Sequence, residues 1–371
     1  MSDSNNSPIA TAIDAPAQGS SQEGSAIAPP AMIAIAPAPA PPAAEIVGIE
    51  AIDRAATLLR EGCLVAFATE TVYGLGADAG NRDALQKLYR VKKRPAAHPV
   101  IVHLASIDDL PLWAAEVSPH AEKLASAFWP GPLTLVVRRA AHVLDELTGG
   151  QDTVALRVPR HPLAQALLLA LREGADGGRP LGIAAPSANR FGKVSPTSAE
   201  HVRADLGADV DLILDGGACE VGIESTIVDV TGEIPSILRP GRVTAAQIES
   251  LLHIQLAEPS ESSPAAPGSL PVHYAPRAKA KLAKRVQIIE QLAVNRGRRI
   301  AVLALEVSVP RLAVSLTAVE SAVPASYAHS LYANLRRLDA TGADLILIET
   351  PPDTPGWAGV MDRLRRATRS D

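Results

Sequence analysis

Cysteine and aromatic residues are scarce in this sequence, and each shortage argues against a class of protein. The chain of 371 residues has 2 cysteines, Cys63 and Cys219, which lie far apart and form no C-x-x-C pair. We therefore expect neither a disulfide framework nor a zinc site, and a reducing cytoplasm fits this composition best. Aromatic residues make up 3% of the chain, which leaves few platforms for stacking nucleic-acid bases.

Positive charge and long apolar runs are also lacking. The formal net charge of -5 argues against a protein that coats nucleic acid, although it permits a local basic site. The apolar run at 167–171 is far shorter than a membrane span and is followed at once by Arg172. We expect no transmembrane helix and no membrane partner.

The composition changes along the chain and predicts its organisation. Residues 1–44 are rich in Ala, Pro and Ser and predict a disordered tail. Over residues 45–254, strand-like and helix-like stretches alternate, which predicts an α/β domain with a mixed sheet. Residues 255–280 are rich in Pro, Ser and Ala and predict a linker, and residues 281–371 predict a small second α/β domain.

The stretch ATETVYGLGADAG at 68–80 combines glycines with hydroxyl groups. Its glycines have the spacing G-x-G-x-x-x-G, one residue longer than the dinucleotide-binding fingerprint, and no G-x-x-x-x-G-K-[ST] phosphate loop occurs in the chain. The hydroxyls of Thr69, Thr71 and Tyr73 either bind a small polar ligand or cap the following turn. Spacing alone does not decide between these two roles.

The stretch YRVKKRPAAHPVIVHL at 89–104 gathers four cations. Arg90 and Lys92 need no ligand, because basic residues at a helix C-terminus interact favourably with the helix dipole. Arg94 differs, because the prolines around it hold the chain extended and place it off the helix, just before an apolar strand. A cation there needs a partner, and the planar guanidinium suits phosphate or carboxylate. The stretch therefore predicts a bound anion.

The stretch APSANRFGKVSPTS at 185–198 concentrates hydroxyl and amide groups after an apolar strand. We expect Ser198 to cap the helix that follows it. Ser187 and Asn189 come where the strand ends, which is the usual position of ligand contacts in an open α/β sheet. A serine hydrolase is not indicated, because the chain has no G-x-S-x-G turn. Metal-ligand spacing is also missing.

Six motifs occur in a fixed order, namely TETVYGLG, KKRPAAHPVIVHL, WPGPLTLVV, PSANRFGKVSPTS, GIESTIVD and LRPG. Together with HYAP at 273–276 and LYANLRRLDATGADLILIETPP near the end, they resemble the two-domain threonylcarbamoyl-AMP synthases of the YrdC family. The resemblance runs from about residue 45 to the end of the chain. It implies a YrdC-like twisted mixed sheet with flanking helices, followed by a small Rossmann-like α/β domain.

The resemblance also implies a reaction. These enzymes are nucleotidyltransferases that convert L-threonine, bicarbonate or CO2, and ATP with Mg²⁺ into threonylcarbamoyl-adenylate and pyrophosphate. A partner transferase then uses the adenylate to modify the adenosine beside the tRNA anticodon. Because threonine carbamate is a weak nucleophile that must meet the α-phosphorus in line, the protein is expected to act by positioning and by neutralising charge.

The resemblance assigns site residues position by position. The K-x-R and S-x-N motifs of the family, expected to be catalytic, fall on Lys92, Arg94, Ser187 and Asn189. The ATP contacts would be Arg94, His98, Thr134, Ser187, Ser195, Arg239 and Tyr274. The threonine contacts would be Thr71, His103, Arg138, the backbone of Ala185, and Ser225, with Arg138 meeting the carboxylate. The magnesium ligands are not identified in this way.

The sequence departs from the family in two places and leaves alternatives open. The family usually has Asn where this chain has His98, and basic and aromatic residues where this chain reads PGSLPV before HYAP. One alternative is a non-catalytic RNA-binding module of the same fold, which would hold structured RNA through its phosphates. Net acidity and scarce aromatics argue against it. A second alternative is a family member with a different carbamoyl acceptor, and whether tRNA binds directly is also left open.

Overall fold

The structure is a computed structural model, and it describes residues 43–173, 179–270, 272–295, 297–305, 316–319 and 321–369. The tail predicted at 1–44 lies outside these residues except for Ala43 and Ala44. Within the described ranges, no helix is both long and apolar enough to cross a membrane.

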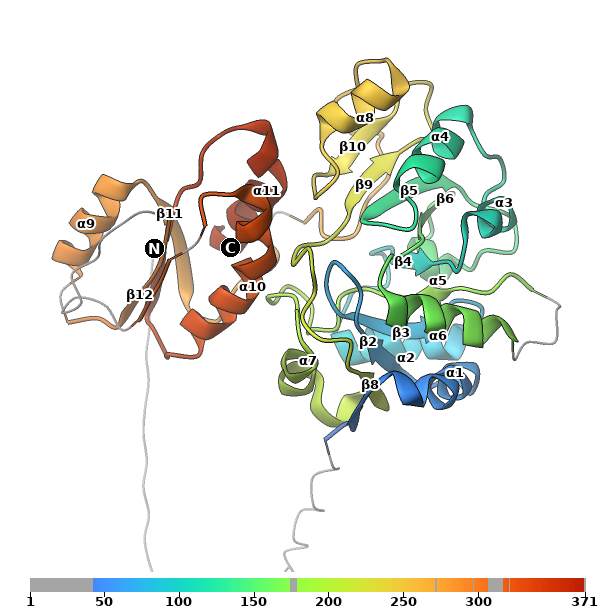
Figure 1. Cartoon of the computed structure of the whole chain (residues 1–371), viewed down its shortest axis with the longest axis horizontal. Coiled ribbons are helices and arrows are strands. Elements are labelled where there is room, and N and C mark those ends of the chain that lie inside the picture. The colour runs from blue at the N-terminus through green and yellow to red at the C-terminus, as the bar shows by residue number, and fades with distance from the viewer. Residues whose placement is uncertain are drawn as a thin grey trace, which may run out of the picture. The chain divides into compact units, whose positions relative to one another are not determined.

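Ten strands form one mixed sheet in the order β1-β8-β2-β3-β7-β4-β6-β5-β9-β10 (Figure 1). Its strands are β1 (Ile46–Val47), β2 (Val65–Phe67), β3 (Gly74–Asp78), β4 (Ile101–His103), β5 (Leu133–Arg138), β6 (Thr153–Arg157), β7 (Ile183–Ala184), β8 (Leu212–Leu214), β9 (Thr226–Asp229) and β10 (Ser236–Arg239). Strand β4 runs parallel to β6, whereas β5 runs antiparallel to β6. We call this part the large-sheet domain, and it confirms the predicted mixed sheet.

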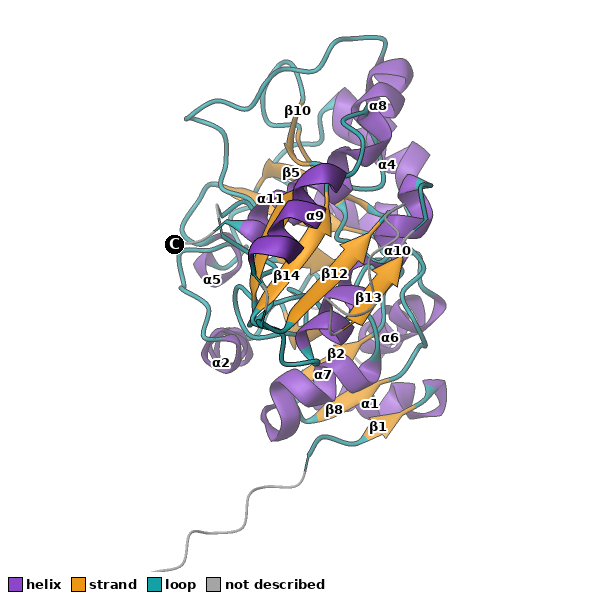
Figure 2. Ribbon diagram, turned by 90° about the vertical axis from the view of Figure 1, so that its left-hand side faces the viewer, coloured by secondary structure: helices purple, strands orange, loops and turns teal. Residues whose placement is uncertain are grey.

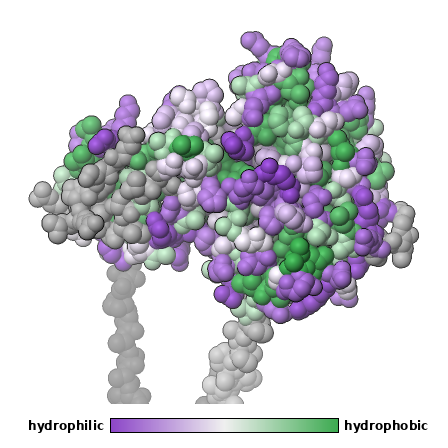
Figure 3. Space-filling model, in the orientation of Figure 1, coloured by the Kyte–Doolittle hydropathy of each residue, from purple (hydrophilic) through white to green (hydrophobic). Residues whose placement is uncertain are grey.

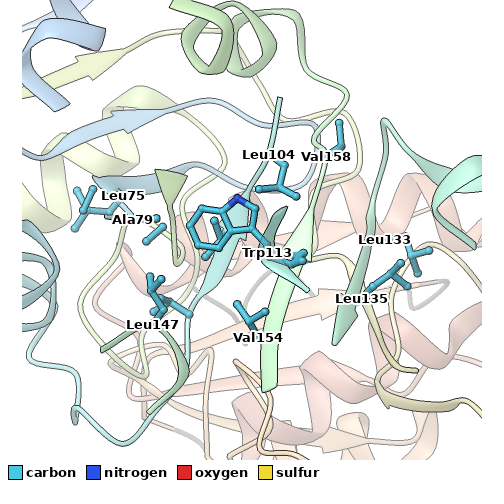
Figure 4. Packing of buried hydrophobic residues seen from close by; sticks show 14 of the residues in the cluster. Leu75, Ala79, Leu104, Trp113, Leu133, Leu135, Leu147, Val154 and Val158 are labelled. Atoms are coloured by element: carbon cyan, nitrogen blue, oxygen red, sulfur yellow. The ribbon is translucent and has the colours of Figure 1, made fainter. Parts of the chain in front are cut away.

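Helices cover the large sheet on both faces. They are α1 (Ile52–Arg60), α2 (Arg82–Lys92), α3 (Leu110–Trp113), α4 (Pro119–Phe128), α5 (Asp145–Thr148), α6 (Pro162–Glu173), α7 (Ala199–Leu206) and α8 (Ala245–Leu252). Helices α1 and α6 pack on one face, and α2, α4, α7 and α8 contribute to the larger core on the other. Figure 4 shows the buried Trp113 indole in this larger core, among Leu75, Ala79, Leu104 and Leu147.

Side-chain caps decide where the helices near the sequence motifs begin and end. Ser198 caps α7 by accepting a hydrogen bond from the His201 amide at 3.4 Å, which confirms the predicted cap. Helix α2 ends at Lys92, and the C-cap residue Lys93 takes the left-handed conformation with φ 54°. That turn directs the chain away from the helix axis, so Arg94 leaves α2 as the sequence predicts.

Close packing between strands accounts for two glycines of the stretch at 68–80. A Cβ at Gly76 would lie 2.9 Å from the Val65 carbonyl oxygen, and one at Gly74 would lie 3.1 Å from the Ala185 Cβ. Both positions lie on β3, between β2 and β7. These glycines therefore have a role in packing the sheet that needs no dinucleotide.

A second, parallel sheet forms from later residues and has the order β11-β14-β12-β13. Its elements are β11 (Lys279–Ala283), α9 (Arg285–Val294), β12 (Ile300–Ala304), β13 (Leu316–Val319), α10 (Pro324–Asp339), β14 (Leu345–Glu349) and α11 (Ala358–Thr368). Figure 2 shows β14, β12 and β13 side by side. Helix α9 packs on one face, and α10 and α11 pack on the other. We call this part the small-sheet domain, and it confirms the Rossmann-like expectation.

The predicted domain boundaries stay predictions, although the sheets can be compared with them. Strands β1 to β10 lie within the predicted residues 45–254, and β11 begins at Lys279, inside the predicted linker 255–280.

On the face shown in Figure 3, hydrophilic and hydrophobic residues are interspersed. The exposed apolar residues Val286, Ile289 and Val294 belong to α9.

Candidate active site

Alternation along three neighbouring strands places polar side chains on one face of the large sheet. Val102, Leu135 and Leu156 point into the larger core. Because side chains of a strand alternate between faces, Thr134, His103 and Arg157 point to the opposite face. The register pairs His103 directly with Arg157, so these two polar residues are neighbours.

A cavity of about 50 Å³ lies on this polar face. Eight of the residues assigned from the sequence line it, namely Thr71, Arg94, His103, Ala185, Ser187, Ser225, Arg239 and Tyr274. The cavity has room for a few water molecules and is partly open to solvent. Part of its wall comes from the predicted linker, through Pro267, Gly268, His273 and Tyr274.

Three buried arginines line the cavity, namely Arg94, Arg157 and Arg239. Arg94 donates to the Pro99 carbonyl at 2.6 Å, and Arg239 donates to the carbonyls of Ser225 at 2.9 Å and Pro267 at 2.7 Å. Burial lowers the pKa of Arg94 and of Arg239 from the usual arginine value. Fixed guanidinium groups around a small polar cavity suit an anionic ligand.

Arg157 organises the threonine-rich wall of the cavity. Its guanidinium donates to the Thr71 hydroxyl at 2.8 Å and to the Gly131 carbonyl at 3.1 Å, and it lies 2.7 Å from the Glu70 carboxylate. Burial alone would raise the pKa of Glu70, but Arg157 holds it below the usual value. The pair is therefore ionised, and Thr71 is held in place by it.

His103 is buried, and its imidazole lines the cavity. Burial, together with the nearby Arg157, lowers the pKa of His103 to about 3. The ring is therefore neutral near pH 7. No hydrogen-bond partner of its Nδ1 atom occurs among the residues that the structure describes. A neutral imidazole with a free nitrogen can bind a ligand hydroxyl or amino group.

Lys92 and Asn189 shape the loop that carries Ser187. The Lys92 ammonium is buried and donates to the carbonyls of Ser187 and, at 2.6 Å, of Asn189. The Asn189 side chain donates to the Lys193 carbonyl at 2.8 Å. Burial, and then Arg94, lowers the pKa of Lys92 well below its usual value. The structure thus brings the four expected catalytic residues together, with Lys92 and Asn189 bonded to backbone rather than lining the cavity.

Three further residues assigned from the sequence do not line the cavity but are hydrogen-bonded to residues that do, namely Thr134, Ser195 and His98. The Thr134 hydroxyl shares a 2.7 Å hydrogen bond with the Ser225 hydroxyl, and Ser195 donates to the Glu224 carboxylate at 2.6 Å. The His98 carbonyl accepts from Arg94 at 3.3 Å. Burial, and then Arg94, lowers the pKa of the His98 ring. His98 therefore contacts Arg94 through its backbone, and its ring is neutral near pH 7.

The structure does not bring Arg138 to the cavity. Its side chain is 60% exposed and pairs with Asp152 at 3.2 Å. Arg138 is four residues from Thr134 on the same face of β5, which corresponds to about 13 Å along a strand. The same T-x-x-x-R spacing recurs in β6 as Thr153 and Arg157. Since β6 runs antiparallel to β5, its arginine ends beside the cavity, and the repeated spacing was the signal that could have identified it.

Sequence reasoning also missed the partners of Glu224. Glu224 lines the cavity. Its carboxylate accepts hydrogen bonds from Arg363 at 2.7 Å and from Tyr332 at 2.9 Å. Both partners belong to the small-sheet domain. In the sequence, Arg363 is one of several arginines in an amphipathic helix, where solvent exposure is the ordinary expectation, so no sequence signal distinguishes it.

The cavity does not fit a resident metal ion. In the part of the chain that the structure describes, no group of three or more His, Cys, Asp or Glu residues could hold one. Glu224 lines the cavity but is paired with Arg363, and Glu70 behind it is paired with Arg157. Neither carboxylate is free to act as a ligand.

The mixed sheet thus carries a small cavity in which buried arginines and hydroxyl groups meet, an arrangement that suits a small anionic ligand in an α/β enzyme. Residues 57–241 match the Sua5, YciO and YrdC family described as telomere recombination, and residues 243–368 match the C-terminal domain of threonylcarbamoyl-AMP synthase.

Known proteins of this kind resemble the chain over most of its length. It is 41% identical to the threonylcarbamoyl-AMP synthase of Bacillus subtilis (strain 168), over 85% of this chain and 92% of that protein. It is 39% identical to the threonylcarbamoyl-AMP synthase of Pyrococcus abyssi (strain GE5 / Orsay), over 85% of this chain and 93% of that protein. The crystal structure of P. abyssi Sua5 complexed with L-threonine has a TM-score of 0.78 at 38% identity, covering 88% of this chain and 96% of that one. This chain belongs to the threonylcarbamoyl-AMP synthase family, which confirms the resemblance.

Proposed function

We propose that this protein forms threonylcarbamoyl-adenylate and pyrophosphate from L-threonine, bicarbonate and ATP. The observation that carries the proposal is the cavity, in which three buried arginines meet hydroxyl groups and a neutral histidine. Its chemistry matches an anionic nucleotide and a small zwitterion. The names of the relatives, and the L-threonine bound in the P. abyssi structure, support the same substrates.

The threonine end of the site is assigned to Thr71, His103, Ala185 and Arg157. An arginine has five N–H donors, and two of those of Arg157 are hydrogen-bonded, to Gly131 and Thr71, whereas its Nη2 atom lies 2.7 Å from the Glu70 carboxylate in an ion pair. We assign the donors that are not hydrogen-bonded within the described part of the chain to the threonine carboxylate. Arg157 therefore takes the role that the sequence assigned to Arg138.

The nucleotide end is assigned to Arg94, Arg239, Ser187 and Ser195, with Lys92 and Asn189 holding the loop of Ser187 in place. The neutral threonine amine and bicarbonate form a carbamate and release water, and a carbamate oxygen attacks the α-phosphorus of ATP. The bond from that phosphorus to the leaving pyrophosphate breaks. The arginines neutralise the charge of the triphosphate and of the departing pyrophosphate, which lowers the barrier without a covalent enzyme intermediate.

The linker is assigned the role of a lid. Gly268, His273 and Tyr274 belong to the wall of the cavity, and we assign this segment to move aside when the nucleotide enters. When it closes again, it excludes water and protects the labile adenylate from hydrolysis. In the present, closed arrangement the Tyr274 ring stacks on the Tyr332 ring, with 5.7 Å between the ring centres.

The remaining partners follow from the chemistry of the product. Magnesium would enter with ATP, held by the phosphates, because the described side chains offer no ligand set for it. The adenylate would pass to a partner transferase that modifies tRNA in the cytoplasm. The domain boundaries at 45–254, 255–280 and 281–371 belong to the same proposal.

Pyrophosphate release by the purified protein tests the function. The reaction contains ATP, Mg²⁺ and bicarbonate, with and without L-threonine, and we expect release that depends on both threonine and bicarbonate. Release that is independent of threonine would mean that the carbamoyl acceptor is a different molecule. Steeply salt-dependent tRNA binding without any turnover would instead indicate the RNA-binding module.

A further inference from the structure

Glu224 is the acidic residue among those that line the cavity, and the hydrogen bonds to its carboxylate come from two domains. One oxygen accepts from the Ser195 hydroxyl at 2.6 Å, within the large-sheet domain. The other accepts from the Tyr332 hydroxyl at 2.9 Å and from Arg363 at 2.7 Å, both in the small-sheet domain. A negative charge thus stands beside the cavity where a triphosphate is to bind, and its ion-pair partner Arg363 comes from outside the large sheet.

Arg363 is completely buried, with a side-chain exposure of 0%, and it contacts the wall of the site as well as Asp362 of its own helix, at 2.6 Å. Besides the Glu224 carboxylate, it donates to the Glu224 carbonyl at 3.3 Å and to the Pro240 carbonyl at 3.0 Å, next to Arg239. Its guanidinium carbon lies 5.3 Å from the centre of the Tyr274 ring. One side chain of α11 therefore contacts the nucleotide wall and the lid together.

The charge of Glu224 depends on Arg363. Burial would raise the pKa of Glu224, but Arg363, followed by Arg239, lowers it to about 2. The charged and titratable groups around Glu224 and Arg363 are Arg239 of β10, Asp362 of α11, Tyr332 of α10, and His273 and Tyr274 of the linker. Without Arg363, an ionised carboxylate would remain in a buried site beside the phosphates of ATP, which is unfavourable on both counts.

We propose that Arg363 is a positioning residue of the active site, which neutralises Glu224 and so keeps Ser195 and Arg239 in place to receive ATP. This inference rests on the proposed function. It makes the small-sheet domain part of the nucleotide site, although none of its residues lines the cavity among those that the structure describes.

The test measures the dissociation constant of ATP with Mg²⁺ by isothermal titration calorimetry at pH 8 and pH 6. Its variants are Arg363→Gln, Glu224→Gln and the double variant. The matched control is Arg365→Gln, an exposed arginine on the same helix. Each value is expressed relative to wild type at the same pH, so the titration of ATP itself cancels.

We expect Arg363→Gln to weaken ATP binding at pH 8 by at least about tenfold, through repulsion by the unpaired carboxylate. The loss should shrink at pH 6, because a Glu224 without its partner binds a proton more readily. Neutralising Glu224 in the double variant should restore binding to within about twofold of Glu224→Gln at both pH values. Arg365→Gln should bind as wild type does.

A purely structural role for Arg363 predicts a different pattern. Binding would then be equally weak at both pH values, and the double variant would be as weak as Arg363→Gln, which would overturn the proposal. If Arg363→Gln does not fold, ATP binding by Glu224→Gln is compared with ATP binding by the double variant. A dissociation constant about tenfold higher in the double variant would also overturn the proposal. Absence of ATP binding by wild type would instead contradict the proposed function itself.

Discussion

Replacing Arg157 by Gln should impair threonine binding more than any other single change of a side chain at the threonine end. The substitution removes the cation that we assign to the threonine carboxylate, and a hydrogen bond to a charged group contributes about 1.5–3 kcal/mol. The Michaelis constant for threonine should therefore rise by about 10- to 150-fold, measured by pyrophosphate release at saturating ATP. The constant for ATP should change much less.

Arg157→Gln also leaves Glu70 without its partner, and breaking such a buried ion pair costs about 3–5 kcal/mol of stability. The double variant Arg157→Gln with Glu70→Gln separates the two effects. It should recover much of the lost stability in urea unfolding, because no buried charge remains unpaired. It should not recover threonine binding, because the carboxylate partner is still absent.

Arg138→Gln is the matched control. It changes the arginine of the same T-x-x-x-R spacing on the neighbouring strand, where the side chain is 60% exposed. We expect its Michaelis constant for threonine to equal that of wild type. The reasoning would be refuted by the reverse pattern, in which Arg138→Gln impairs threonine use and Arg157→Gln does not.

Three further predictions concern the cations, the histidines and the lid. Arg94→Ala should lower the rate of adenylate formation by about 100-fold or more with an unchanged circular dichroism spectrum, and wild-type turnover would contradict the assignment. Burial lowers the pKa of His103 and of His273 to about 3, whereas unfolded histidine titrates near 6.5, so the unfolded chain binds more protons in acid. The free energy of unfolding should therefore fall as the pH decreases from about 6.5 towards 3, with a smaller slope in His273→Gln, as measured by urea unfolding. Gly268→Ala should open the lid, because φ is +76° there and the new Cβ would overlap the Tyr274 hydroxyl, and proteolysis of residues 255–280 should then be faster than in wild type.

Much of the fold, and several of the residues that line the cavity, could be predicted because the signals are local. Alternating helix and strand patterns indicated the mixed sheet, and the hydrogen bond from His201 to Ser198 has the spacing of an ordinary cap. The clusters around Arg94 and Ser187 stood out because polar groups follow apolar strands. In both cases the residues that interact are close in sequence.

Other features could not be predicted because they depend on pairs of residues far apart in the chain. The Lys92 ammonium bonds the Ser187 and Asn189 carbonyls, 95 and 97 positions later, so it supports a loop, whereas the family resemblance implied a catalytic role for it. Glu224 and Arg363 are 139 positions apart and form a buried ion pair. The sequence around neither residue predicts this pair.

The sequence by itself determined the secondary structure, the order of the motifs and, through them, the family. Only the tertiary structure decided which arginine faces the cavity. Thr134 with Arg138 and Thr153 with Arg157 have the same spacing and the same strand propensity. What separates them is the direction of each strand, and in an antiparallel pair equal patterns end at opposite edges of the sheet. Direction is set by the strands that each one pairs with, so it depends on contacts that no local stretch of sequence contains.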